Sequence, residues 1–264
     1  MDKRLPSKLD HFDFFHFKWD ELNNTNNIEH RHEICNPLWR EIKSEIIENG
    51  KFDYVLDLGT GDGRLALQLN DFFSNFIFVD QANSSLNYIN NNFLKDHLAR
   101  VALLNFDLAS LDEEKWEIDT DEFNNKIDFV IFGHFFHYLN KKQIIRLLSN
   151  VKTLIKDEGH YYLACETEIQ QRFPENPNNI KSFLFKNQYN HTIEDLKKII
   201  SDLNFILMEE KQFRQPPFNS AIPKSFFELN MKDILGFKDE SDEVYCKKPF
   251  YIRDYQLIEL YFKK

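Results

Sequence analysis

Three glycines lie within five residues in the stretch VLDLGTGDGR, which runs from Val55 to Arg64. The whole chain of 264 residues has only seven glycines, where average usage predicts roughly 18. A glycine-poor chain that keeps three in one turn indicates close contact between that backbone and a small molecule. A P-loop is disfavoured because no Lys follows Gly63, and the spacing G-x-G-x-G differs from that of dinucleotide-binding turns. A strand-to-helix turn that holds no ligand is the alternative.

Two further acidic residues follow apolar runs that read as strands. Asp80 ends the run FIFVD, and Asp107 follows VALLNF. In parallel sheets, ligands bind at the carboxyl ends of the strands, where a carboxylate can accept both hydroxyls of a ribose. A single Asp at such a place is commonly a turn former or a helix cap. Two of them after a glycine turn predict a nucleoside site.

The elements that must position these residues alternate between strand and helix. Strands are expected at 52–58, 75–79, 101–106, 128–132, 160–165, 205–210 and 255–262. Helices are expected after the Asn36-Pro37 start, at 64–73, at 83–98, after Asn140 and after Thr192. The acidic stretch 111–126 is expected to form a helix and an exposed loop, and 172–179 a loop. Repeated strand–helix units with short connections predict a parallel sheet covered on both faces.

The motifs VLDLGTGDG, FIFVDQA and NFDL together resemble the class I S-adenosylmethionine-dependent methyltransferases, over roughly residues 51–210. The resemblance implies a three-layer, Rossmann-like α/β fold. Its seven-stranded, mostly parallel sheet has the order 3-2-1-4-5-7-6 and an antiparallel last strand. On this basis residues 51–212 form the methyltransferase core and 251–264 supply the last strand.

The same resemblance implies S-adenosylmethionine as cofactor and a set of residues that bind it. These are Asp57, Gly59, Thr60, Gly61, Gly63, Asp80, Gln81, Asp107 and Leu108. The glycine turn would pass under the methionine part and the ribose, Asp80 would hold the ribose hydroxyls, and Gln81 would meet the adenine edge. Asp107 and the Leu108 backbone would contact the adenine, and Asp57 would orient the turn or reach the cofactor amine.

Two histidines follow the fourth expected strand, in the segment FGHFFHYL. A hydroxyl acceptor needs a base to take its proton, most often histidine, whereas an amine can react after desolvation and orientation alone. We expect His137 as the first candidate and His134 as the second. A metal site is disfavoured because neither has a carboxylate at ligand spacing. Glu166 and His191 could line the same pocket, or be a solvated strand end and an N-cap neighbour.

Two segments lie outside the core that the resemblance covers. Residues 1–50 contain Phe12, Phe14, Phe17 and Trp19, which could close over the cofactor as a lid or form a helix packed on the core. Residues 213–250 form an insertion rich in apolar side chains. Such an insertion suits a substrate cap or the surface of a homodimer.

Motifs that the chain lacks narrow the range of possible methyl acceptors. Amino-group methylases of the family carry an (Asn/Asp)-Pro-Pro-aromatic signature after the fourth strand, whereas this chain has Phe132-Gly133-His134-Phe135. No Pro-Cys nucleophile pair occurs, and a net charge of −10 disfavours an extended nucleic-acid surface. We expect methyl transfer to an O or N atom of a small organic acceptor. Methylation of a protein, peptide or RNA, and cofactor binding without methyl transfer, are the alternatives.

Composition indicates a cytoplasmic protein without a membrane partner. Cys35, Cys165 and Cys246 are scattered and form no C-x-x-C pair, as is usual in a reducing compartment. The first thirty residues contain no apolar segment typical of a signal peptide. No apolar run reaches the roughly 18 residues of a membrane span.

Overall fold

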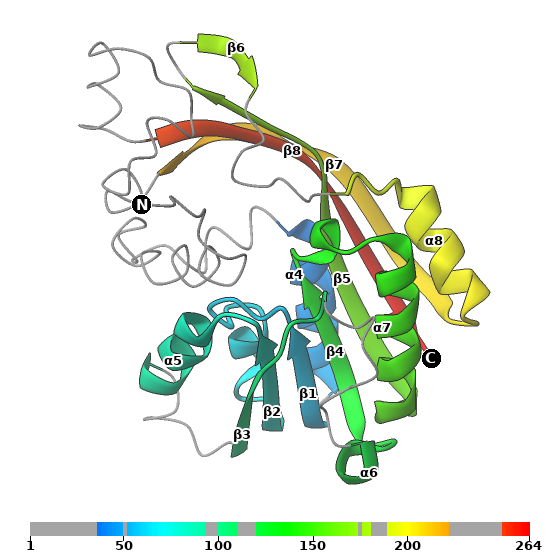
Figure 1. Cartoon of the computed structure of the whole chain (residues 1–264). Coiled ribbons are helices and arrows are strands. Elements are labelled where there is room, and N and C mark those ends of the chain that lie inside the picture. Colours follow the sequence, from blue (N-terminus) through cyan, green and yellow to red (C-terminus); the bar gives the residue numbers. More distant parts are fainter. Residues whose placement is uncertain are drawn as a thin grey trace, which may run out of the picture.

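The computed structural model describes residues 36–49, 52–92, 100–109, 120–173, 176–180, 189–221 and 250–264. These residues form a mixed sheet in the order β3-β2-β1-β4-β5-β8-β7 (Figure 1). The strands are β1 (Phe52–Leu58), β2 (Phe73–Asp80), β3 (Arg100–Asn105), β4 (Ile127–Gly133), β5 (Ile155–Phe173), β6 (Asn176–Ile180), β7 (Ile206–Ala221) and β8 (Phe250–Lys263). Strands β1 to β5 are parallel, and β8 is antiparallel to both β5 and β7. The predicted Rossmann-like order with an antiparallel last strand is confirmed.

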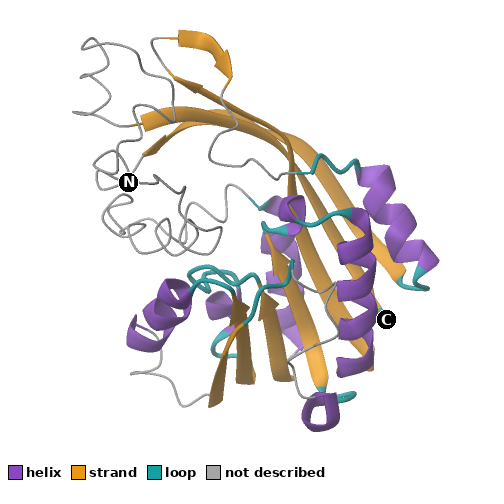
Figure 2. Ribbon diagram, viewed as in Figure 1, coloured by secondary structure: helices purple, strands orange, loops and turns teal. Residues whose placement is uncertain are grey.

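Helices cover both faces of the sheet, which gives three layers (Figure 2). They are α4 (Pro37–Asn49), α5 (Asn83–Asn92), α6 (Thr120–Phe123), α7 (Lys141–Leu154) and α8 (Ile193–Asp202), with 3₁₀ turns η1 (Ala66–Leu69) and η2 (Phe136–Tyr138). Successive residues of the central strands point to opposite faces, as the pleat requires. In β4, for example, Val130 and Phe132 pack in the cluster under α7 and α8, while Phe129 and Ile131 pack in the cluster under α4 and α5.

The predicted starts of α7 and α8 are confirmed by their hydrogen bonds. Asn140 and Gln143 form a capping box at α7, and Thr192 and Asp195 form one at α8. Each box satisfies two backbone N–H groups that have no partner within the helix. These two helices therefore begin where local sequence signals place them.

The helix expected at 64–73 is wrong. Only the 3₁₀ turn Ala66–Leu69 forms, and β2 already begins at Phe73. Phe73 pairs with Phe52 at the start of β1, and their rings stack at 5.4 Å between centroids. This pairing draws the chain into the sheet before a longer helix can form.

The loop expected at 172–179 is also wrong, because β5, β7 and β8 run well past the ends of β1 to β4 (Figure 1). β5 continues to Phe173, and β6 pairs back onto it. Pro177 is tolerated in β6 because a strand at a sheet edge does not need every N–H. Irregular pairing interrupts β5 between Thr167 and Gln170, and β7 between Gln215 and Phe218, on either side of β8. Bulges of this kind bend a sheet.

Two expected segments lie largely outside the described residues. The proposed lid side chains Phe12, Phe14, Phe17 and Trp19 are among them. So are residues 222–249 of the expected insertion, whose two ends are strand in the structure. Among the described helices, none is both long enough and apolar enough to cross a membrane.

Candidate active site

The glycine turn follows β1 and folds over the end of β2. The backbone N–H groups of Gly59 and Thr60 both donate to the carbonyl of Val79, at 2.8 and 3.1 Å. Gly59, Gly61 and Gly63 all have positive φ. A Cβ on Gly59 would also lie 2.6 Å from the ring of Phe135. The turn therefore needs glycine at position 59 for its conformation and for space.

The carboxylate of Asp80 ties this turn to the start of α5. Its Oδ2 accepts from the Gly61 N–H and its Oδ1 from the Ala82 N–H, both at 2.8 Å. The residue is only 6% exposed. Gln81 lies between Asp80 and Ala82, at the same edge of the sheet. The structure therefore brings together the glycine turn and the acid expected to hold a ribose.

Asp57, the last but one residue of β1, is buried beneath the turn. The Thr60 hydroxyl donates to its Oδ2 at 2.7 Å. Burial raises the pKa of Asp57 to about 7, the Thr60 hydrogen bond opposes this rise, and the nearby charges of Asp80 and Asp62 add to it. A cation near this carboxyl group would favour its ionised form. Asp57 is therefore suited to a positively charged ligand.

Asp107 and Leu108 follow β3, the outer strand of this half. The Asp107 Oδ1 accepts from the Ala109 N–H at 2.8 Å, and Leu108 is buried in the core. The preceding residue, Phe106, donates its N–H to the carbonyl of Asp80 at 3.0 Å. The ends of β1, β2 and β3 thus bring all the predicted cofactor-binding residues to one edge.

His134 follows β4, next to the Phe135 ring that packs on Gly59. Its Nδ1 lies 3.2 Å from Glu166 Oε1, and its Nε2 lies 3.1 Å from the Asn36 amide nitrogen. Glu166 is 5% exposed, whereas 23% of the His134 side chain reaches the surface. His134 also has a φ of 53°, uncommon for a non-glycine residue and often found at functional sites. Two predicted pocket residues, His134 and Glu166, are therefore in direct contact.

The other two candidate histidines lie inside the protein. His137 is 1% exposed, and its ring packs against Tyr138 with 4.1 Å between centroids. His191 is 3% exposed, and its Nε2 lies 2.9 Å from the Leu139 carbonyl oxygen. Burial lowers the pKa of His191. Of the three histidines, only His134 is placed where an acceptor could reach it.

The sequence analysis did not assign three further residues to this site, namely Asn36, Tyr162 and Glu259. Asn36 directly precedes α4, as expected, and its carbonyl accepts from the Arg40 N–H at 3.2 Å, but its side-chain amide contacts Tyr162 Oη at 2.8 Å and His134. The cap comes from Glu259 of β8, whose carboxylate accepts from the N–H groups of Leu38 and Trp39. A residue 221 positions away leaves no local signal for this role, because only the packed sheet brings it to the helix.

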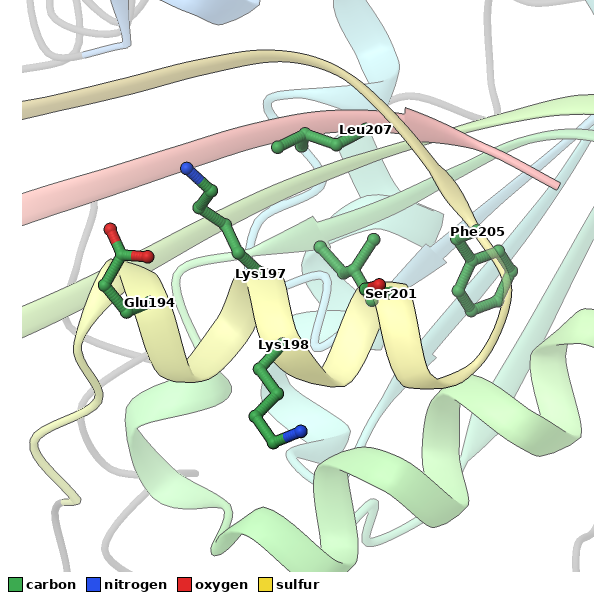
Figure 3. A pocket seen from close by; sticks show the side chains of 7 residues that line it. Glu194, Lys197, Lys198, Ser201, Phe205 and Leu207 are labelled. Atoms are coloured by element: carbon green, nitrogen blue, oxygen red, sulfur yellow. The ribbon is translucent and has the colours of Figure 1, made fainter.

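A cavity of about 400 Å³ lies elsewhere, between α8 and β7 (Figure 3). Its two lysines are already paired, Lys197 with Glu210 at 2.7 Å and Lys198 with Asp202 at 3.1 Å. It holds none of the predicted site residues. Among the described residues there is also no cluster of three or more His, Cys, Asp or Glu side chains that could bind a metal.

Comparisons with known proteins agree with this geometry. Residues 56–161 match a family model described as a methyltransferase domain, while no curated protein matches the chain. An S-adenosylmethionine-dependent methyltransferase from Mesorhizobium loti is similar in structure, with a TM-score of 0.54, 12% identity, and coverage of 86% of this chain and 96% of that chain. One from Leishmania major has a TM-score of 0.54 and 10% identity, over 94% of this chain and 80% of that chain.

A third similar structure is DhpI in complex with SAH, with a TM-score of 0.53 and 14% identity, over 78% of this chain and 88% of that chain. The matched domain contains the end of β1, the glycine turn, β2, β3 and β4, and the sheet has the order expected of the family. Residues 56–161 therefore form a methyltransferase domain, and the chain has the fold of S-adenosylmethionine-dependent methyltransferases.

Proposed function

We propose that the enzyme methylates an O or N atom of a small organic acceptor, with His134 as the general base. The contact between His134 Nδ1 and the nearly buried Glu166 carboxylate carries this proposal. A histidine oriented by a carboxylate is a common arrangement for taking a proton near neutral pH. Bound S-adenosylmethionine would supply an electrophilic methyl group on a sulfonium.

The contact with Glu166 decides which nitrogen of His134 is the base. An ionised carboxylate only accepts hydrogen bonds, so Nδ1 carries the proton and Nε2 keeps its lone pair. The Nε2 lone pair faces the Asn36 amide, and the acceptor hydroxyl would take the place of that N–H. The proton released by the acceptor passes to Nε2, and Glu166 stabilises the imidazolium that forms. An amine acceptor would use the same position with less need for the base.

The position of His134 supports transfer close to the glycine turn. Phe135, its neighbour in the chain, packs on Gly59, so the base lies beside the residues proposed to hold the cofactor. We further propose that Asp80 accepts the ribose hydroxyls. Its oxygens already accept two backbone N–H groups, but a carboxylate has about four lone-pair sites. Gln81 and Asp107 would then meet the adenine.

The surroundings of the site support a small acceptor over a macromolecule. The long ends of β5, β7 and β8 extend beyond this edge of the sheet (Figure 1). With the segments 1–50 and 213–250 as lid and cap, they would enclose the acceptor. The net charge of −10 is unfavourable for RNA, and the scattered cysteines suit the cytoplasm. The segment 213–250 could also form the surface of a homodimer.

Methyl transfer from isotopically labelled S-adenosylmethionine tests the acceptor class. The enzyme is incubated with a library of small alcohols, phenols and amines, and in parallel with peptide and RNA pools. We expect label in small-molecule products. Label only in peptide or RNA would replace this proposal by the macromolecular one. Cofactor binding without label in any pool would favour a protein of this fold that binds the cofactor for another purpose.

A further inference from the structure

A continuous chain of hydrogen bonds runs from the N-terminus of α4 to His134. The Glu259 carboxylate accepts from the Leu38 and Trp39 N–H groups, each at 3.2 Å. It also accepts from the Tyr162 hydroxyl at 2.7 Å. Tyr162 Oη accepts in turn from the Asn36 amide nitrogen at 2.8 Å. Glu259, Tyr162 and Asn36 are all buried, so water does not compete for these bonds.

Burial raises the pKa of Glu259, but three donors converge on its carboxylate and favour the ionised form, which gives this chain a direction. An ionised carboxylate has no proton to donate, so the single hydroxyl proton of Tyr162 must point to Glu259. Oxygen Oη of Tyr162 is then left as an acceptor, and only the NH₂ end of Asn36 can serve it. This bond fixes the orientation of the Asn36 amide, so that its nitrogen Nδ2 lies between Tyr162 and His134. The distance from Nδ2 to Nε2 of His134 is 3.1 Å. Its second N–H is free to donate to the Nε2 lone pair.

We propose that Tyr162 and Glu259 are positioning residues that, through Asn36, keep Nε2 of His134 unprotonated and ready to accept a proton. This inference rests on the proposed role of His134 as base. Glu166 acts on Nδ1 and the Asn36 amide acts on Nε2, so the two contacts select the same tautomer from opposite sides of the ring. The Asn36 carbonyl oxygen is 3.2 Å from Nε2, so the amide can accept from the imidazolium once the proton has been transferred.

The substitution Tyr162→Phe breaks the chain while leaving the Glu259 charge in place. Without Oη the Asn36 amide is free to turn its oxygen to Nε2, which favours a proton there. Tyr161→Phe is the matched control. Tyr161 is the preceding residue on the opposite face of β5, fully buried, and among the described residues its hydroxyl has no hydrogen-bond partner. Asn36→Asp is a second variant, since a carboxylate at position 36 can only accept from Nε2.

Nitrogen-15 NMR of histidine-labelled protein at pH 8 measures the protonation of Nε2, with the His134→Asn spectrum assigning the signal. We expect an unprotonated Nε2 in the wild type and in Tyr161→Phe, and a larger protonated fraction in Tyr162→Phe and Asn36→Asp. Turnover should fall about 10-fold or more in these two variants, with unchanged affinity for S-adenosylmethionine. An Nε2 signal identical to wild type in both variants would overturn the inference. Wild-type turnover in His134→Asn would instead overturn the role of His134 as base.

Discussion

The two halves of the carboxyl edge of the sheet are built in different ways. In the half formed by β1, β2 and β3, hydrogen bonds join residues that are 3, 19 and 2 positions apart, and two of the three donors are backbone N–H groups. In the half formed by β4, β5 and β8, the bonds of His134, Asn36 and Tyr162 join side chains that are 32, 98, 126 and 97 positions apart. We call these the cofactor half and the acceptor half.

Under the proposed function, this difference means that cofactor binding and methyl transfer depend on different kinds of contact. The cofactor half offers main-chain groups and carboxylates to the proposed cofactor, and a compact local motif suffices for this. The acceptor half uses side chains from distant parts of the chain, each of which can be changed without disturbing the glycine turn. Substitutions in the first half should change the affinity for S-adenosylmethionine, and substitutions in the second should change the rate of methyl transfer.

The largest effect is expected from His134→Asn in the acceptor half. Loss of a general base lowers turnover by about 10²–10⁴-fold for a hydroxyl acceptor. The dissociation constant of S-adenosylmethionine, measured by calorimetry, should change less than about threefold, because cofactor contacts are proposed for the other half. His160→Asn is the control, since His160 lies at the opposite end of β5, where Tyr261 contacts its Nδ1 at 2.8 Å.

Substitutions of His134 and His137, which lie in the same segment, also show which of the two is the general base. Because His137 is buried in the core, His137→Ala should lower the melting temperature and leave the turnover of the folded protein near that of wild type. If His137→Ala folds normally yet loses turnover while His134→Asn keeps it, His137 is the base. The proposed contrast between the two halves would then lose its main support.

An intermediate effect is expected from Asp80→Ala in the cofactor half. The substitution leaves the Gly61 and Ala82 N–H groups without their acceptor and removes the proposed ribose ligand. The binding free energy of S-adenosylmethionine should weaken by about 1–3 kcal/mol, measured by calorimetry.

Asp128→Ala is its matched control, at the other edge of the sheet. One oxygen of Asp128 accepts from the N–H groups of Asp53 and Tyr54, at 2.9 and 2.8 Å. This variant should lose stability but bind the cofactor as the wild type does. Equal loss of cofactor affinity in both variants would mean that Asp80 acts only through stability, and that the cofactor pocket is wrongly assigned.

The same contrast explains what the sequence could predict. The strand order could be predicted only through the resemblance to a known family. The glycine turn, Asp57 and Asp80 could be recognised in short motifs, because the residues that interact there are close in the sequence. The capping boxes of α7 and α8 are equally local. The errors at 64–73 and 172–179 arose where pairing between strands, which is set by tertiary structure, outweighs local propensity.

For the acceptor half, the sequence indicates single candidate residues but not the contacts between them. His134 and Glu166 were both noted, yet nothing in their spacing of 32 residues reveals a contact. His134 and His137 lie three positions apart and look equivalent in the sequence, whereas the structure buries His137 and leaves His134 partly exposed. Asn36 was interpreted as a helix cap, since Asn before Pro is a strong local signal, while the partners of its side-chain amide are 98 and 126 positions away.

The smallest effect, in the cofactor half, is expected from Asp57→Asn. The raised pKa of about 7 means that the folded chain holds a proton that the unfolded chain releases at lower pH. The contribution of Asp57 to stability is therefore complete below its ordinary pKa and is lost as the pH rises through about 7. Without cofactor, Asp57→Asn should stabilise the protein at pH 8 and have little effect at pH 4, measured by urea unfolding.

The hydroxyl of Thr60 provides the opposite change, because it donates to Asp57 and favours the ionised form. Thr60→Val should therefore destabilise the protein at pH 8 more than at pH 4. With saturating S-adenosylmethionine the advantage of Asp57→Asn at pH 8 should disappear, since a bound cation stabilises the ionised carboxylate of the wild type. Parallel pH profiles for wild type and Asp57→Asn, with and without cofactor, would show that Asp57 does not respond to the cation. The cofactor half would then recognise its ligand by shape and backbone contacts alone.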